Sequence, residues 1–271
     1  MADPILTAHL FPKIERLLLE LLRSLTPDEW EMQTVAPKWK VKDVAAHLLD
    51  TPLRKLSIVR DGYMRESQKI DGLVAFINQL NQDGVALYSR LSPRVLISLM
   101  ELASRESAEF HQSLDPFSPA AFAVSWAGEN ESLNWFDTAR ELTERWHHQQ
   151  QIRLAVNRPG IMTREFYHPV LDCFMRALPH TYRNFPTEPG TLLQFDIRGE
   201  CGGTWWLYRD DHWRLVAEPE GKSVCRVTIP QEIAWRIFTK GIDKASAAAQ
   251  VNMEGDEKLG LPILSMTAIV G

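Results

Sequence analysis

The hydrophobic pattern of this 271-residue chain changes character once, near residue 160. Before that point, apolar residues recur three and four positions apart over long segments, a spacing typical of amphipathic helices. After it, short segments rich in β-branched and aromatic residues alternate with Gly, Asp and Pro, which indicates strands joined by turns. We therefore predict an α+β protein of two domains, a four-helix bundle over 1–160 and a small α+β domain over 161–271.

Four long helices are expected in the first part, over 5–25, 41–63, 83–114 and 134–156. Proline removes a backbone donor, so Pro52 is expected to kink or restart the second helix and Pro93 to allow a break in the third. In the second part, the pattern predicts one helix over 164–182, four strands within 191–230, a helix over 230–241, a strand within 249–256, and a short helix with Asp256 as its N-cap.

The charge balance and the cysteines exclude several classes of protein. Thirty basic residues against 35 acidic ones leave a net charge of −5, so no positive field gathers the phosphates of a nucleic acid. The three cysteines form no C-x-x-C pair, which argues against a disulfide framework and for a reducing compartment. The first residues lack a signal-peptide pattern, and no apolar stretch approaches the roughly 20 residues that cross a bilayer. We expect a cytoplasmic protein that binds neither nucleic acid nor membrane.

The fourth helix carries a cluster of polar side chains. Glu144 and His148 are four residues apart and project from one face, with Glu141 and Gln151 beside them. On a lone helix this face would be exposed, whereas in a bundle it would line an internal pocket. Two ligands on one helix and a third on a neighbour are a common metal site in bundles, and His47 on the second helix is the natural third.

Other interpretations of these residues remain open on spacing alone. A Glu and a His four residues apart are also typical of a solvated ion pair. His147 competes with His148, because residues three apart on a helix share a face as well. His47 taken by itself is equally consistent with a histidine held by backbone hydrogen bonds.

Three segments read together resemble one protein family. They are W-K-V-K-D-V-A-A-H-L over 39–48, W-A-G from Trp126, and E-R-W-H-H-Q-Q-Q-I-R over 144–153. These segments are similar to those of the mycothiol-dependent maleylpyruvate isomerase family, a branch of the DinB-like metal-binding bundles. The resemblance implies that His47, Glu144 and His148 bind a divalent metal, and it selects His148 over His147.

The C-terminal part also resembles this family, whose members carry a small sterol-carrier-like α+β domain. The segments that carry this resemblance are A-W-R-I-F-T-K-G over 234–241 and V-N-M-E-G-D over 251–256. The chain departs from the family pattern at two places. Many relatives have Thr-Gly-Arg where this chain has Thr239-Lys240-Gly241, and many have Asp where it has Gln151.

Two imidazoles and one carboxylate leave coordination positions open, which is typical of a catalytic rather than a structural metal site. Zinc is expected from the ligand types, and nickel or iron would accept the same set. The resemblance implies a low-molecular-weight thiol such as mycothiol as cosubstrate, held as the nucleophilic thiolate. The implied reaction is cis–trans isomerisation or thiol S-transfer on a small electrophile.

The remaining site residues are expected around that metal. Arg236 is the expected catalytic cation over the pocket, with Lys240 as the other candidate, and both are also consistent with solvated charges on an amphipathic helix. Trp126 and Gln151 are the expected substrate-binding residues. Two further hypotheses stay open: a small apolar ligand-binding protein with a non-catalytic metal site, and a regulatory module with a vestigial metal.

Overall fold

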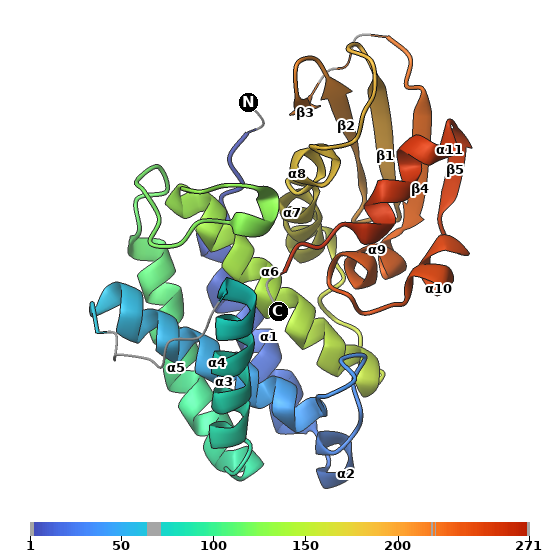
Figure 1. Cartoon of the computed structure of the whole chain (residues 1–271). Coiled ribbons are helices and arrows are strands. Elements are labelled where there is room, and N and C mark those ends of the chain that lie inside the picture. The colour runs from blue at the N-terminus through green and yellow to red at the C-terminus, as the bar shows by residue number, and fades with distance from the viewer. Residues whose placement is uncertain (1–2, 64–71, 218, 220, 270–271) are drawn as a thin grey trace.

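The computed structural model describes residues 3–63, 72–217, 219 and 221–269. A helical N-terminal part is followed by a mixed five-stranded sheet with its own helices, as the change of pattern near residue 160 predicted (Figure 1). In the described part of the chain, no helix is both long and apolar enough to cross a bilayer.

Four helices form the bundle: α1 (Phe11–Ser24), α3 (Val41–Lys55), α5 (Pro93–Ser113) and α6 (Asn134–Ala155). In α1, buried residues recur at the expected three- and four-residue spacing, at Ile14, Leu18, Leu21 and Leu22. A short 3-10 helix, η1 (Ala8–Leu10), precedes α1, and a capped single turn, α2 (Pro27–Trp30), follows it. A fifth helix, α4 (Leu73–Tyr88), packs against α3.

The bundle helices differ from the expectation in two details: the second helix does not restart at Pro52, and the helix expected from residue 83 begins earlier. The α-helix α3 continues through Pro52 to Lys55, and a short π-helical segment, η2 (Leu56–Arg60), follows it. The missing N–H of Pro52 frees the carbonyl of Leu48, and the guanidinium of Arg145 donates to that oxygen instead. The segment 83–114 is divided at Pro93 as expected, since α5 begins there with Ser92 as its N-cap, but the helix before the break, α4, begins ten residues earlier than expected, at Leu73.

The second part is built on a sheet of order β3-β2-β1-β4-β5. Its strands are β1 (Leu192–Arg198), β2 (Gly203–Arg209), β3 (Trp213–Val216), β4 (Cys225–Pro230) and β5 (Asn252–Gly255). The pair β1–β4 is parallel and the other neighbours are antiparallel. Phe195 of β1 lies level with Trp205 and Val227, and all three are buried on the covered face. Alternate residues therefore separate a core face from a polar face, as strand geometry requires.

Helices cover one face of this sheet and join it to the bundle. They are α7 (Arg164–Met175), α8 (Leu178–Tyr182), α9 (Gln231–Phe238), α10 (Lys244–Ala248) and α11 (Glu257–Gly260), the last followed by η4 (Leu261–Ser265). The expected single helix over 164–182 is two helices, α7 and α8, whereas the side chain of Asp256 caps α11 as predicted. Figure 1 shows α6 between the bundle and α7, so this helix has neighbours on both sides.

A continuous hydrophobic cluster runs through both parts of the chain. It contains Phe11 and Ile14 of the bundle together with Phe195 and Ile229 of the sheet. At its centre the indole of Trp146 stacks on Tyr167, with ring centroids 4.3 Å apart, and its Nε1 donates to the carbonyl of Ile161. The division at residue 160 stays a prediction, because the two parts share this core.

Candidate metal centre

The structure brings His47, Glu144 and His148 together at the interface of α3 and α6. One ligand atom from each lies within 4.8 Å of the other two. His47 and His148 are buried, and the side chain of Glu144 is partly exposed. The polar face of α6 therefore points into the bundle, which is the alternative that predicted an internal pocket.

The imidazole of His148 is held from both of its nitrogens. Its Nδ1 lies 2.9 Å from Oε1 of Gln151, and its Nε2 lies 3.4 Å from Oε2 of Glu144. When Nδ1 donates to the amide oxygen, Nε2 presents a lone pair toward the carboxylate. Two acceptor atoms that face each other in this way are stabilised by a shared cation or proton.

His47 supplies a neutral imidazole. Burial lowers its pKa well below the usual value, and the neighbouring charges of His148 and Arg54 lower it further. Its ring meets that of His148 edge-on, with centroids 4.5 Å apart. Nδ1 of His47 is buried and has no hydrogen-bond partner among the described residues, so His47 is not held by backbone hydrogen bonds through this atom.

Glu144 supplies the negative charge. Burial by itself would raise the pKa of this carboxyl group. The contact with His148 and the interactions with the neighbouring imidazoles and the guanidinium of Arg140 outweigh burial, so the pKa is lowered. The group is therefore ionised at neutral pH.

His147 lies beside His148, with ring centroids 3.9 Å apart, but it is not one of the three grouped ligands. Its Nδ1 lies 2.9 Å from the carbonyl of Thr143 on its own helix, and burial lowers its pKa to about 3. The geometry therefore groups His148, and not its neighbour, with His47 and Glu144.

The indole of Trp39 forms an aromatic wall that the sequence did not assign to the site. Its ring centroid lies 4.8 Å from that of His47 and 5.8 Å from that of His148. Trp39 precedes α3 and is the first residue of the W-K-V-K-D motif, so its position in that motif was the available signal.

The residues fit a divalent ion. Ligands bound about 2.0–2.2 Å from one ion lie roughly 3–4 Å apart. Side-chain movements of less than about 1 Å would therefore close the three ligand atoms on a common centre. The donor set and the unpartnered Nδ1 of His47 agree with such an ion.

Two buried polar contacts position α3 and α6 around the triad. Arg145, directly after Glu144, pairs with Glu15 of α1 at 2.8 Å and donates to the carbonyl of Leu48 on α3. The other carboxylate oxygen of Glu15 accepts from Ser104 of α5 at 2.7 Å. One ion pair thus contacts all four bundle helices.

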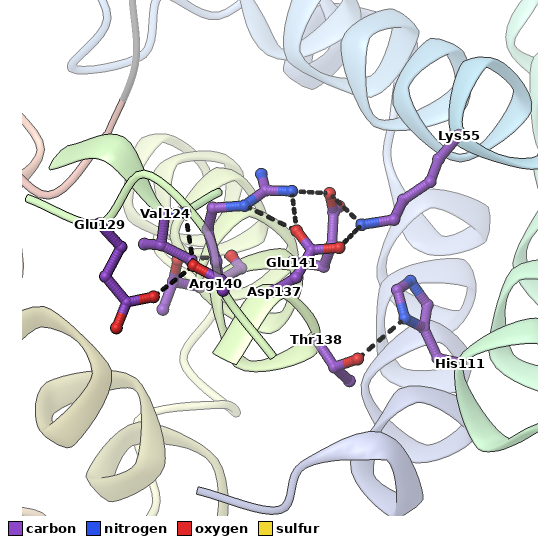
Figure 2. Close-up of polar contacts among 10 residues, drawn as sticks. Lys55, His111, Val124, Glu129, Asp137, Thr138, Arg140 and Glu141 are labelled. Atoms are coloured by element: carbon purple, nitrogen blue, oxygen red, sulfur yellow. Dashed lines mark hydrogen bonds and ion pairs between the residues drawn. The ribbon is translucent and has the colours of Figure 1, made fainter. Parts of the chain in front are cut away.

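A second ion cluster lies further along the same interface (Figure 2). Nζ of Lys55 lies 2.7 Å from Asp137 and 3.0 Å from Glu141, and Arg140 pairs with the same two carboxylates. Burial opposes ionisation of Asp137 and Glu141, but the two cations lower the pKa of both. Four charges therefore compensate one another in pairs, as buried charges require.

The other predicted site residues lie elsewhere in the fold. The indole of Trp126 is buried and packs edge-on against Phe136, two helical turns before Glu144. Nε of Arg236 donates to the carbonyl of Gly241 and closes the turn after α9. Lys240 adopts a positive φ of 59° in that turn. Gln151 contacts His148, as described above. The predicted contacts of these residues with substrate stay predictions.

The fold and the site define a class: a helical bundle that presents two histidines and a glutamate on facing helices, followed by an α+β part. The chain matches the mycothiol maleylpyruvate isomerase N-terminal domain family over residues 11–153, more than half of its length. It belongs to this family.

Two solved structures align with most of the chain. A crystal structure of a mutant of the mycothiol-dependent maleylpyruvate isomerase has a TM-score of 0.55 at 11% sequence identity, covering 93% of this chain and 96% of the other. A second crystal structure of that isomerase has a TM-score of 0.48 at 12% identity, covering 87% and 91%. The first similarity shows that the two proteins share a fold. No curated protein matched this sequence significantly.

Proposed function

We propose that this protein is a metal-dependent enzyme that uses a low-molecular-weight thiol, of the maleylpyruvate isomerase type. The observation that carries the proposal is the convergence of His47, Glu144 and His148 from α3 and α6. Family membership and the shared fold support a thiol such as mycothiol as the cosubstrate. Zinc is the expected ion from the ligand types, and nickel or iron suits the same ligands.

The chain's own residues would hold and orient the reacting groups. His47 is neutral and offers a lone pair, Glu144 offers a charge, and Gln151 holds the ring of His148 through Nδ1. A divalent cation bound by these three residues would lower the pKa of a thiol and keep it as thiolate at neutral pH. Trp39 covers the two histidines and would limit the access of water.

The proposed isomerisation consumes no thiol. The thiolate adds to one carbon of a cis double bond and forms a C–S bond, and the electron pair of the π bond moves into the adjacent carbonyl system. The former double bond is then single and rotates. When the C–S bond breaks, the electron pair returns to form the trans double bond, and the thiolate is released. In S-transfer the C–S bond would remain. An addition would be completed when the adjacent carbon takes up the proton that the thiol had lost, and a displacement when the leaving group departs with its bonding electron pair, so that the product leaves as a thioether.

Elemental analysis tests the metal site. We expect about one divalent metal ion per chain in the wild type, most of it absent from His148→Ala and retained by His147→Ala. The two variants remove neighbouring imidazoles of the same helix, so a general loss of structure would affect both. Equal loss from both variants would contradict the assignment, and so would a metal-free wild type.

An assay with maleylpyruvate then tests the reaction. The loaded wild type should isomerise maleylpyruvate only when a thiol such as mycothiol is present, and His148→Ala should lose this activity. Metal binding without any thiol-dependent turnover of maleylpyruvate or simple electrophiles would contradict the proposed enzymatic function. That outcome would favour an apolar ligand-binding protein with a non-catalytic metal site.

A further inference from the structure

A cavity of about 440 Å³ opens between the N-terminal segment, the end of α5 and the beginning of α6. This volume is within the usual range for small-molecule sites, about 300–1,000 Å³. None of His47, Glu144 and His148 lines it. The cavity is therefore separate from the candidate metal centre.

Four buried polar side chains line this cavity, those of Thr7, His111, Asn134 and Thr138, and the amide of Asn134 already donates to the carbonyl of Asp115. Thr7, His111 and Thr138 expose only 1%, 2% and 5% of their surface. Oγ1 of Thr7 is buried and has no hydrogen-bond partner among the described residues. Because an unpaired buried hydroxyl is costly, a ligand group that pairs with it gains a contact that the protein itself leaves open.

The imidazole of His111 is fixed in position and neutral. Its ring stacks on Phe11, with centroids 4.4 Å apart and an interplanar angle of 22°. Nδ1 lies 3.5 Å from Oγ1 of Thr138 (Figure 2). Burial, followed by the nearby charge of Lys55, lowers the pKa of His111 to about 3. A neutral imidazole offers one donor and one acceptor.

The rest of the lining is largely apolar. It includes Leu6, Leu114, Pro116 and the indole of Trp135. It contains no Asp, Glu, Lys or Arg, and its other polar members, His9 and Gln112, are exposed. The indole stacks on Phe136 with centroids 5.0 Å apart, and the guanidinium of Arg176 lies 5.8 Å from its ring centre. These two contacts orient Trp135, which adds an apolar indole surface to the wall of the cavity.

We propose that this cavity binds an uncharged small molecule that combines an aromatic or apolar body with a hydroxyl group. The body packs against Trp135 and the aliphatic side chains. The hydroxyl both donates and accepts, so it pairs with the polar group formed by Thr7, His111 and Thr138. A carboxylate is rejected, because no Lys or Arg lines the cavity to replace its hydration and the buried His111 is neutral.

Calorimetric titration of the full chain with phenol, benzene and benzoate tests this proposal. We expect one phenol per chain, weaker binding of benzene, and no binding of benzoate. No phenol binding at tens of millimolar would overturn the proposal, and so would benzoate binding as tightly as phenol. Phenol binding that is lost in His148→Ala would place the probe at the metal centre and would overturn it as well.

Two variants place the probe in the cavity. Thr138→Val removes a hydroxyl and should weaken phenol binding about five-fold, the usual effect of one neutral hydrogen bond, whereas Thr138→Ser keeps the hydroxyl and should bind nearly as well as the wild type. Ala8→Trp should block the cavity and abolish binding. Unchanged phenol affinity in Thr138→Val would overturn the proposal, even if Ala8→Trp fails to fold.

Discussion

At the scale of single residues, burial decides which histidines of this protein are neutral. Burial is the largest cause of the lowered pKa of His47, His111 and His147. A neutral imidazole has the free lone pair that a metal or a hydrogen-bond donor needs, whereas a protonated one has none. The environment of each ring thus determines its chemistry before any ligand binds.

His111 makes the stability of the protein depend on pH. Its pKa is about 3 in the folded protein and about 6.5 in the unfolded chain. Between these two values the unfolded chain binds a proton that the folded protein does not bind. The contribution of neutral His111 to the stability of the folded state is therefore fully present above pH 6.5. It is lost as the pH falls toward 3. Between pH 7 and pH 5 this one group should reduce the free energy of unfolding by about 2 kcal/mol.

Urea denaturation of wild type and His111→Phe at pH 7 and pH 5 measures this contribution. The wild type should lose about 2 kcal/mol more than the variant over this interval. The other buried histidines are present in both proteins, so their contributions cancel. Equal losses would show that His111 is not the titrating group.

Gln151 is expected to determine how firmly His148 is oriented. Gln151→Leu removes the acceptor for Nδ1, and loss of such a partner typically reduces metal affinity about 10- to 100-fold. Gln150→Leu is the matched control, because this neighbouring glutamine makes no contact with the triad among the contacts described. Competition with a chromophoric chelator measures both affinities, and equal affinity in the two variants would contradict the positioning role.

At the scale of elements, the polar contacts show how α3 and α6 are paired. Lys55, at the end of α3, meets Asp137 near the beginning of α6, while His47, earlier in α3, meets His148, later in α6. The two helices are therefore antiparallel. The ion cluster lies at one level along this interface, and the Arg145–Leu48 contact lies beside the triad at another, so all of them constrain the same helix register.

Arg145 is the residue on which this arrangement should depend most. Arg145→Met leaves the carboxylate of Glu15 buried without its cation and should cost about 3–5 kcal/mol of stability. The double variant Glu15→Met/Arg145→Met removes both charges and should cost less than Arg145→Met alone. Denaturant titrations of the wild type, the two single variants and the double variant give the coupling free energy between Glu15 and Arg145. Additive losses of stability would show that the two side chains do not stabilise each other.

At the scale of the whole molecule, the two parts of the chain share one core. Trp146 of α6 stacks on Tyr167 of α7 and meets Trp235 of α9 edge-on at 6.0 Å. A second contact joins the 3-10 turn η3 (Ser125–Ala127) to α8. There Gly128 adopts a φ of +87°, and a Cβ on it would lie 2.5 Å from Nδ1 of His180.

Gly128→Ala should destabilise this second contact through both backbone strain and the clash with His180. Gly190→Ala is the matched control, since Gly190 has a φ of +92° with nothing within 4 Å of the added Cβ. Gly190→Ala should cost about 1 kcal/mol, and Gly128→Ala about 1–2 kcal/mol more. The variant Gly128→Ala/His180→Ala should recover part of this difference in thermal unfolding. Equal melting temperatures for the two single variants would exclude the clash.

The sequence by itself determined the parts whose causes are local. Hydrophobic period predicted the helices of the bundle and the strands beyond residue 160, and turn chemistry predicted the break at Pro93 and the cap at Asp256. Helical phase placed Glu144 and His148 on one face. The bundle arrangement suggested His47 as the third ligand, the resemblance implied the same residue and chose His148 over His147, and the structure groups these three residues.

Only the tertiary structure decided what depends on contacts between segments far apart in the sequence. The polar face of α6 turned inward because the charges and imidazoles of α3 and α6 meet there. Pro52 remained inside a helix because Arg145, nearly a hundred residues later, donates to the carbonyl that proline leaves free. The wall formed by Trp39 and the cavity beside His111 arise in the same way, from packing across the chain. No local hydrophobic period or motif predicts such contacts, because they form, and stabilise the protein, only when distant segments meet in the folded chain.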